Sequence, residues 1–235
     1  MPDASLLTIG AACAILCPAT LASGLIVGSI YGLSKESLSF GTGEHLLRLN
    51  EKRFGYLLRQ VLFLLGTLLA IPPGLTLYQI LKAAGSYVGI AALAWAFGLI
   101  LAILNDLLTI VVLAQLLPAY AIRTRAARPA LETIGSVFDR LIRYLQLIGD
   151  MLFIGVGAGL FAIAILQTVV LPGWLGWLGL LASVLAGWLN RPAKLLKAAG
   201  ERLALLGTFG FLLFMCWLIM VGVGLLRSLL LALRI

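Results

Sequence analysis

Long apolar segments separated by short polar ones run along the whole chain. A helix of about 20 apolar residues is long enough to cross the hydrocarbon core of a bilayer. Six segments have this character, so the pattern predicts an all-α integral membrane protein with six transmembrane helices in a single domain, residues 1–235. Their expected limits are Leu6 to Leu33, Tyr56 to Leu81, Gly85 to Leu117, Met151 to Leu171, Gly173 to Leu189 and Leu203 to Leu226.

The segment before the fourth predicted span is amphipathic. After Pro129, apolar residues recur three and four positions apart, while Asp139 and Arg143 fall on the other side. This spacing is that of a helix with one apolar face, which we expect to lie along the inner membrane surface or to extend the fourth span. A shorter stretch, Leu46 to Leu58, has a weaker form of the pattern. The apolar positions of the longer stretch are Leu131, Ile134, Phe138, Leu141, Leu145 and Ile148.

Composition supports the membrane assignment and excludes several kinds of chemistry. Apolar residues make up 62% of the chain and charged residues only 11%, which a soluble domain of this length does not show. One His and three Cys would all be needed for a single four-ligand zinc site, and one His cannot supply two axial ligands to a haem. The sequence therefore offers no catalytic residue, no metal site and no identifiable cofactor.

Basic residues determine the expected orientation. The net charge is +8, but the 17 Lys and Arg residues cluster in loops beside apolar segments, a pattern typical of membrane orientation rather than nucleic-acid binding. Only Lys82, Arg227 and Arg234 fall on one side of the predicted spans. The positive-inside rule therefore puts the three long loops in the cytoplasm and both termini outside it. The loop residues are Lys35, Arg48, Lys52, Arg53, Arg59, Arg123, Arg125, Arg128, Arg140, Arg143, Arg191, Lys194, Lys197 and Arg202.

Asp106 is the one carboxylate placed well within an apolar span, with Asn105 beside it and Thr109 on its face. Buried ionisable groups in membranes are costly unless paired, so we expect these three residues to form a small ligand-binding site or an interhelical hydrogen bond. The depth of Asp106 has two interpretations. If Tyr87 marks the outer interface, Asp106 lies about 28 Å below it, at the cytoplasmic boundary; if Tyr120 marks the inner interface, Asp106 is about 21 Å from it and deeply buried.

Pro72, Pro73 and Gly74 interrupt the second span. Transporters break helices in this way at binding sites, but a simple kink whose freed carbonyls find other partners gives the same sequence. Both alternatives stay open at this point.

Small residues recur every four positions in several spans, for example at Gly24 and Gly28 and at Gly155 and Gly159. Such faces let helices approach closely in lipid, within one bundle or against a second copy or another subunit. Since reactive residues are scarce, the sequence favours a non-catalytic module of a membrane complex or homo-oligomer. The alternative is a small-molecule or amphiphile transporter or binding protein that uses the polar residues of the third span.

The run Leu171-Pro172-Gly173-Trp174-Leu175-Gly176-Trp177-Leu178-Gly179 resembles a Pro-x-Trp-Leu-Gly-Trp-Leu-Gly stretch of a bacterial six-helix membrane family, domain-of-unknown-function family 4386. The stretch from His45 to Arg59 and the Leu77-Tyr78 pair are similar to the middle section of that family. The resemblance implies the six-span layout and a bacterial inner membrane. It implies no activity and no functional residue.

Overall fold

The structure, a computed structural model, describes residues 4–33, 40, 43–122, 127–189 and 200–232. Every regular element within these residues is a helix, so the predicted all-α class is confirmed. The α-helices are α1 (Ala4–Ile30), α2 (Gly43–Glu51), α3 (Arg53–Leu69), α4 (Ile71–Leu81), α5 (Tyr87–Val111), α6 (Leu117–Ile122), α7 (Arg128–Asp150), α8 (Gly159–Gln167), α9 (Gly173–Ala182) and α11 (Gly200–Ala232). Shorter 3-10 or π-helical elements adjoin them: η2 (Lys82–Ala84), η3 (Val112–Leu116), η4 (Met151–Ala158) and η5 (Ser183–Leu189).

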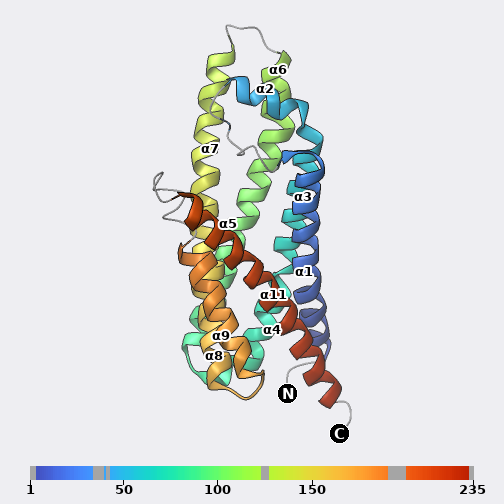
Figure 1. Cartoon of the computed structure of the whole chain (residues 1–235), viewed down its shortest axis with the longest axis vertical. Helices are drawn as coiled ribbons and strands as arrows, with labels where there is room; N and C mark the ends of the chain where they lie inside the picture. The colour runs from blue at the N-terminus through green and yellow to red at the C-terminus, as the bar shows by residue number, and fades with distance from the viewer. Residues whose placement is uncertain (1–3, 34–39, 41–42, 123–126, 190–199, 233–235) are drawn as a thin grey trace.

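The described helices form one elongated bundle (Figure 1). α1 packs against α3 and α11, α5 packs against α3, α7 and η4, and α8 packs against α9. The first turn of α1 and the last turn of α11 lie at the same end, the lower end in Figure 1. α2, α6 and the start of α7 lie at the opposite end.

Five stretches of the described chain are long and apolar enough to cross a membrane: Ala4–Ile30, Arg53–Ala84, Tyr87–Ile122, Arg128–Gln167 and Leu206–Leu230. The fifth predicted span, Gly173 to Leu189, corresponds to the shorter apolar helix Gly173–Trp188. At 1.5 Å per residue it measures about 24 Å, less than the roughly 30 Å of a hydrocarbon core. A membrane helical bundle is therefore shown, whereas six crossings stay a prediction.

The predicted amphipathic helix is present and extends the fourth span. α7, η4 and α8 form one continuous helical stretch from Arg128 to Gln167. Pro129 lies in the first turn of α7, where its missing N–H costs no hydrogen bond. The helix that carries the fourth span therefore starts well before the expected Met151, and it ends at Gln167 because Thr168 has an extended backbone.

The interruption of the second span is a kink. α3 ends at Leu69 and α4 starts at Ile71, and Ala70 between them keeps helical dihedral angles. Pro72 and Pro73 lack the N–H groups that would bond to carbonyls one turn earlier. The indole Nε1 of Trp95 on α5 donates a 3.0 Å hydrogen bond to the carbonyl of Ala70, the residue between α3 and α4. This bond connects the kink to α5.

Two apolar cores hold the molecule together. The larger one runs through the membrane bundle, where the Trp95 ring lies 4.4 Å from that of Phe153 and 5.7 Å from that of Phe161. The smaller one lies at the upper end in Figure 1, among α2, η3, α6 and α7, and we call this region the cap. Its buried side chains are Leu33, Phe40, Leu46, Leu49, Tyr56, Val112, Leu113, Leu116, Leu117 and Tyr120.

Most of the glycines that the sequence singles out pack against helices of the same chain. A Cβ added to Gly187 would lie 2.4 Å from the Gly155 Cα, and one added to Gly24 would lie 2.7 Å from the Phe63 ring. Gly89 is different, because an added Cβ there would meet nothing within 4 Å. The close approaches that these glycines permit are therefore largely used inside the bundle.

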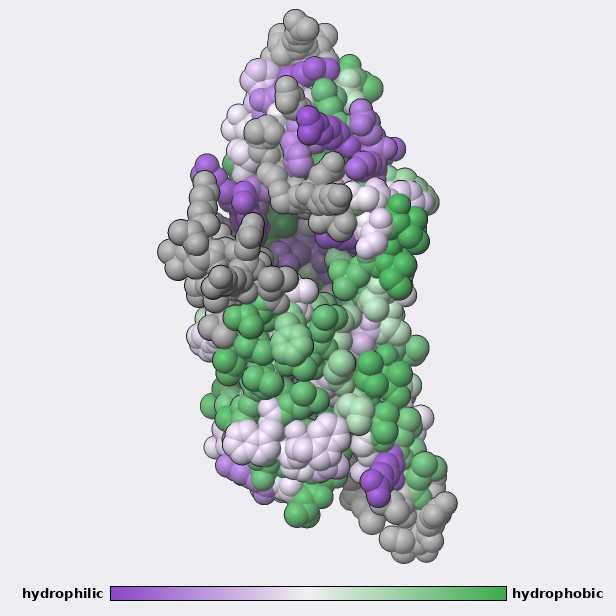
Figure 2. All heavy atoms as spheres, in the orientation of Figure 1, coloured by the Kyte–Doolittle hydropathy of each residue, from purple (hydrophilic) through white to green (hydrophobic). Residues whose placement is uncertain are grey.

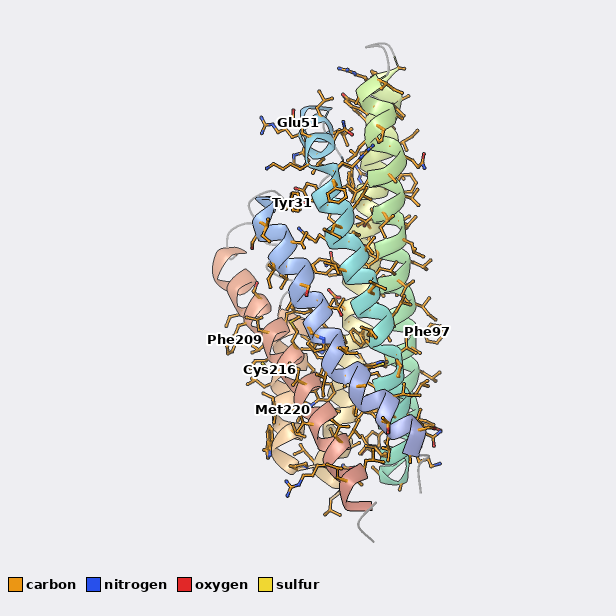
Figure 3. The ribbon with its side chains drawn as sticks, turned by 90° about the vertical axis from the view of Figure 1, so that its right-hand side faces the viewer. Tyr31, Glu51, Phe97, Phe209, Cys216 and Met220 are labelled. Carbon is orange, nitrogen blue, oxygen red and sulfur yellow. The ribbon has the colours of Figure 1, made fainter. Side chains whose placement is uncertain are left out.

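The surface divides along the long axis. Figure 2 shows apolar residues around the middle of the molecule and hydrophilic residues over the upper end, around the cap. Phe97 and Phe209 project outward from the bundle (Figure 3) and are 58% and 53% exposed. In the same view α2, which ends at Glu51, stands beyond the end of α1 near Tyr31. The bundle therefore presents an apolar surface suited to lipid, and the cap a polar one.

Candidate functional site

Asp106 points into the bundle from α5 and is only 6% exposed. Its partners come from α3: Nε2 of Gln60 donates to Oδ1 at 2.6 Å, and Oγ1 of Thr67 lies 3.2 Å from Oδ2. Gln60 and Thr67 are two helical turns apart, so they project from the same face of α3. The carboxylate cluster of Asp106, Gln60 and Thr67 therefore joins α3 to α5.

Thr67 has one hydroxyl hydrogen and two acceptors within reach. Its Oγ1 lies 2.9 Å from the Phe63 carbonyl oxygen as well as 3.2 Å from Asp106. An ionised Asp106 accepts this hydrogen in competition with Phe63. A protonated Asp106 donates to Thr67 instead and leaves Thr67 free to bond to Phe63.

The other two predicted site residues behave differently from Asp106. Thr109 is 3% exposed, but its hydroxyl donates to the Asn105 carbonyl at 2.8 Å, so its polar atom is used within α5. The Asn105 side chain faces the Asp106 carboxylate, and its Oδ1 is buried without a hydrogen-bond partner. The structure thus brings Asn105 and Asp106 together and leaves Thr109 with its own helix.

Two charged residues lie on α3 and α7 near the level of the cluster. Arg59 precedes Gln60 on α3, with its guanidinium 5.2 Å from the Phe63 ring centre and its Nε buried without a partner. Asp150, the last residue of α7, is close enough to interact electrostatically with Asp106. Three helices therefore contribute polar side chains to this level of the bundle.

Tyr87 and Tyr120, which define the two depths expected for Asp106, lie in different surroundings. Tyr87 starts α5 at the lower end and donates a hydrogen bond to Gln167. Tyr120 is 3% exposed within the cap core, where its hydroxyl donates to Glu132 at 2.6 Å. Its burial speaks against Tyr120 as an interface residue, and a depth of about 28 Å from Tyr87, at the cytoplasmic boundary, stays a prediction.

Sequence analysis did not identify Gln60 and Thr67. Each is a polar residue in an apolar span, and their spacing of seven would have placed them on one face of a helix. Which helix that face meets depends on tertiary packing. The sequence could therefore have indicated that Gln60 and Thr67 share a helix face, but not that this face meets Asp106.

A second polar network lies in the cap. Asp139 is 4% exposed, accepts a hydrogen bond from the Phe40 backbone N–H at 3.3 Å, and forms an ion pair with Arg143. Arg128 stacks over the Tyr120 ring, with its guanidinium carbon 5.2 Å from the ring centre. These contacts fix α7 against the rest of the cap.

One face of α7 is apolar and exposed. Its residues are spaced three and four apart, and each exposes 43 to 62% of its surface. On the other side of the helix, Gly135 and Asp139 are buried and Phe138 packs against the cap core. We call the exposed set the α7 seam: Ile134, Val137, Leu141, Tyr144 and Ile148.

The predicted single apolar face of α7 is therefore two faces. Leu131 and Phe138 pack inward on the cap core, whereas Ile134, Leu141 and Ile148 point outward with Val137 and Tyr144. The seam lies on a helix that also carries six charged residues, which are costly to place in hydrocarbon. It is an exposed apolar strip on a charged helix.

Within the described residues, no group of three or more His, Cys, Asp and Glu side chains is placed to hold a metal ion. The family model described as "Domain of unknown function (DUF4386)" matches residues 6–227. Neither a curated protein nor a solved structure matches the chain.

Proposed function

The chain belongs to the DUF4386 family, whose description names no activity. From its structure, we propose that it is a non-catalytic membrane module that assembles with another protein through the cap. The observation that carries the proposal is the α7 seam. Exposed apolar patches of a few hundred Å² on polar surfaces mark interaction sites.

The carboxylate cluster supports the same function. Both Asp106 oxygens have partners within the chain, supplied by Gln60 and Thr67. Such bonds between transmembrane helices each contribute about 0.6 kcal/mol on average. The cluster thus acts as a tie that fixes α3 against α5, beneath the cap that presents the seam.

The orientation follows from the distribution of charge. Arg48, Lys52 and Arg128 belong to elements at the cap end, whereas Lys82 and Arg227 lie near the opposite end. Of the other basic loop residues named above, Arg53 and Arg59 lie in α3, Arg140 and Arg143 in α7 and Arg202 in α11. The remaining six lie outside the described residues: Lys35, Arg123, Arg125, Arg191, Lys194 and Lys197. Under the positive-inside rule the cap is cytoplasmic, six helices cross a bacterial inner membrane, and both termini are extracytoplasmic.

Photo-crosslinking in native membranes tests the assembly proposal. A photoreactive amino acid replaces Tyr144 in the seam or, as a matched control, Gln146, which is exposed on a different side of α7. We expect irradiation to convert the 25.0 kDa chain into a discrete heavier protein adduct from position 144 and not from position 146. Equal yields from both positions, or only lipid adducts, would overturn the proposal.

A second candidate function is the binding of a polar or amphiphilic small molecule at Asn105, Asp106 and Thr109. The observation that favours it is a buried atom without a partner beside the cluster, Asn105 Oδ1. Figure 2 also shows the surface hollowed just below the cap, with hydrophilic residues inside the hollow.

Mass spectrometry of small molecules and lipids that copurify in mild detergent tests this candidate. If it holds, Asp106→Asn and Asn105→Leu each change the bound set relative to the unsubstituted protein. An Asp106→Leu variant with unchanged bound molecules contradicts it.

A further inference from the structure

The α7 seam has the spacing of a coiled-coil contact. Steps of three, four, three and four lead from Ile134 to Ile148, which is the a and d pattern of a heptad repeat. We propose that the partner covering the seam is a second copy of this chain, and that the two copies form a parallel dimer through α7. This inference rests on the proposed assembly function and names its partner.

The side chains at the seam suit a two-stranded contact. Ile134, Leu141 and Ile148 occupy the a positions, and Val137 and Tyr144 occupy the d positions. Two of the three a residues are β-branched, as in parallel two-stranded coiled coils, although those carry Leu at d where this seam has Val and Tyr. Because α7 is already a regular helix held by its inner face, it needs no refolding to pair.

The membrane limits how two copies can meet. All copies insert with the same orientation, so two of them are related by an axis along the membrane normal. Their α7 helices are then parallel and in register, and each seam residue meets its own counterpart. A 3-4 spaced apolar face is self-complementary in this arrangement.

Charges beside the seam do not oppose self-association. In a parallel coiled coil the g position of one helix faces the following e position of its partner. Arg140 is a g residue and faces Leu145, while Thr133 faces Phe138. Among positions 133–148, no like charges face each other across the contact.

The exposed area is sufficient for a membrane-confined dimer. From their exposed fractions, the five seam residues present on the order of 500 Å² per copy, at the upper end of patches on monomeric soluble proteins. Pairing two copies would bury about 1,000 Å², which reaches the lower limit for a specific interface.

Cysteine crosslinking of the full-length protein in membranes tests the dimer. Val137→Cys brings two thiols together at a d position, whereas Gln146→Cys places them away from the axis. After mild oxidation we expect about tenfold more disulfide-linked dimer from Val137→Cys than from Gln146→Cys. The unsubstituted chain, whose Cys13, Cys17 and Cys216 lie in α1 and α11, gives the background.

A charge placed in the seam provides an independent measurement. Leu141 is 43% exposed, so Leu141→Glu leaves the cap core intact but sets two carboxylates face to face in the dimer. We expect the purified protein to change from twice 25.0 kDa to 25.0 kDa. The matched variant Gln146→Glu, with the same added charge outside the seam, should keep the dimer mass.

The outcomes separate this inference from the proposed function. Equal crosslinking of Val137→Cys and Gln146→Cys, together with a mass of 25.0 kDa for the unsubstituted protein, overturns the dimer. If photo-crosslinking from Tyr144 then yields an adduct with a different protein, the assembly function stands and only its partner is wrong. If it yields no protein adduct, both fail.

Discussion

The side-chain amide of Gln60 on α3 lies 2.6 Å from the Asp106 carboxylate on α5. Gln60 and Thr67 are the two α3 residues that form hydrogen bonds with this carboxylate. Replacing Gln60 by Leu removes this donor and leaves a buried oxygen without a partner, so we expect the free energy of unfolding to fall by about 1 to 2 kcal/mol. Asp106→Asn keeps an acceptor for Gln60 and supplies a donor for Thr67, and should change stability by less than about 0.5 kcal/mol.

Unfolding in mixed detergent micelles provides the measurement for this pair. A double-mutant cycle of Gln60→Leu and Asp106→Leu should give a coupling free energy of about 0.6 to 1.7 kcal/mol. A coupling of zero would show that the tie contributes nothing.

Trp95 is expected to stabilise the kink between α3 and α4 through its N–H group. Trp95→Phe keeps an aromatic ring among Phe153, Phe161 and Trp217 but removes the N–H group that bonds to the Ala70 carbonyl. We expect a loss of about 1 to 3 kcal/mol in detergent unfolding, part of it from the smaller ring. Trp177→Phe, at a position 68% exposed, is the control and should cost less than about 0.5 kcal/mol.

Two helical glycines, Gly187 and Gly89, should respond to substitution in opposite directions. In Gly187→Ala the new Cβ would meet backbone atoms of Gly155 at 2.4 and 2.6 Å, so η4 and η5 must separate, at a cost of about 1 to 3 kcal/mol. Gly89→Ala meets nothing within 4 Å and replaces a flexible helical residue, which should stabilise the protein by about 0.5 to 1 kcal/mol. Thermal unfolding of both variants in one detergent checks the difference in sign.

Thiol labelling tests the orientation. Val169, in the connection between α8 and α9, is fully exposed at the end opposite the cap, and Arg140 is exposed on α7. A membrane-impermeant maleimide should label Val169→Cys in intact cells and Arg140→Cys only after permeabilisation. The reverse pattern would show that the cap is extracytoplasmic.

The sequence by itself determined the helices and the helical form of α7, because hydrophobic spacing along one chain is enough to specify a helix and its apolar sides. It also identified Asp106, since a carboxylate within an apolar span is conspicuous whatever surrounds it. It could assign the 171–179 run to its family by local similarity alone, and the family match over residues 6–227 agrees.

Only the tertiary structure decided which surfaces meet. The partners of Asp106 are 46 and 39 residues away on α3, and no local pattern reveals a contact between residues so distant in sequence. The same limit applies to α7: its apolar positions are alike in the sequence, but the cap core covers Leu131 and Phe138 and leaves Leu141 and Tyr144 exposed. Burial is a property of neighbours brought together by folding, and for this reason the α7 seam could not be separated from the core by periodicity alone.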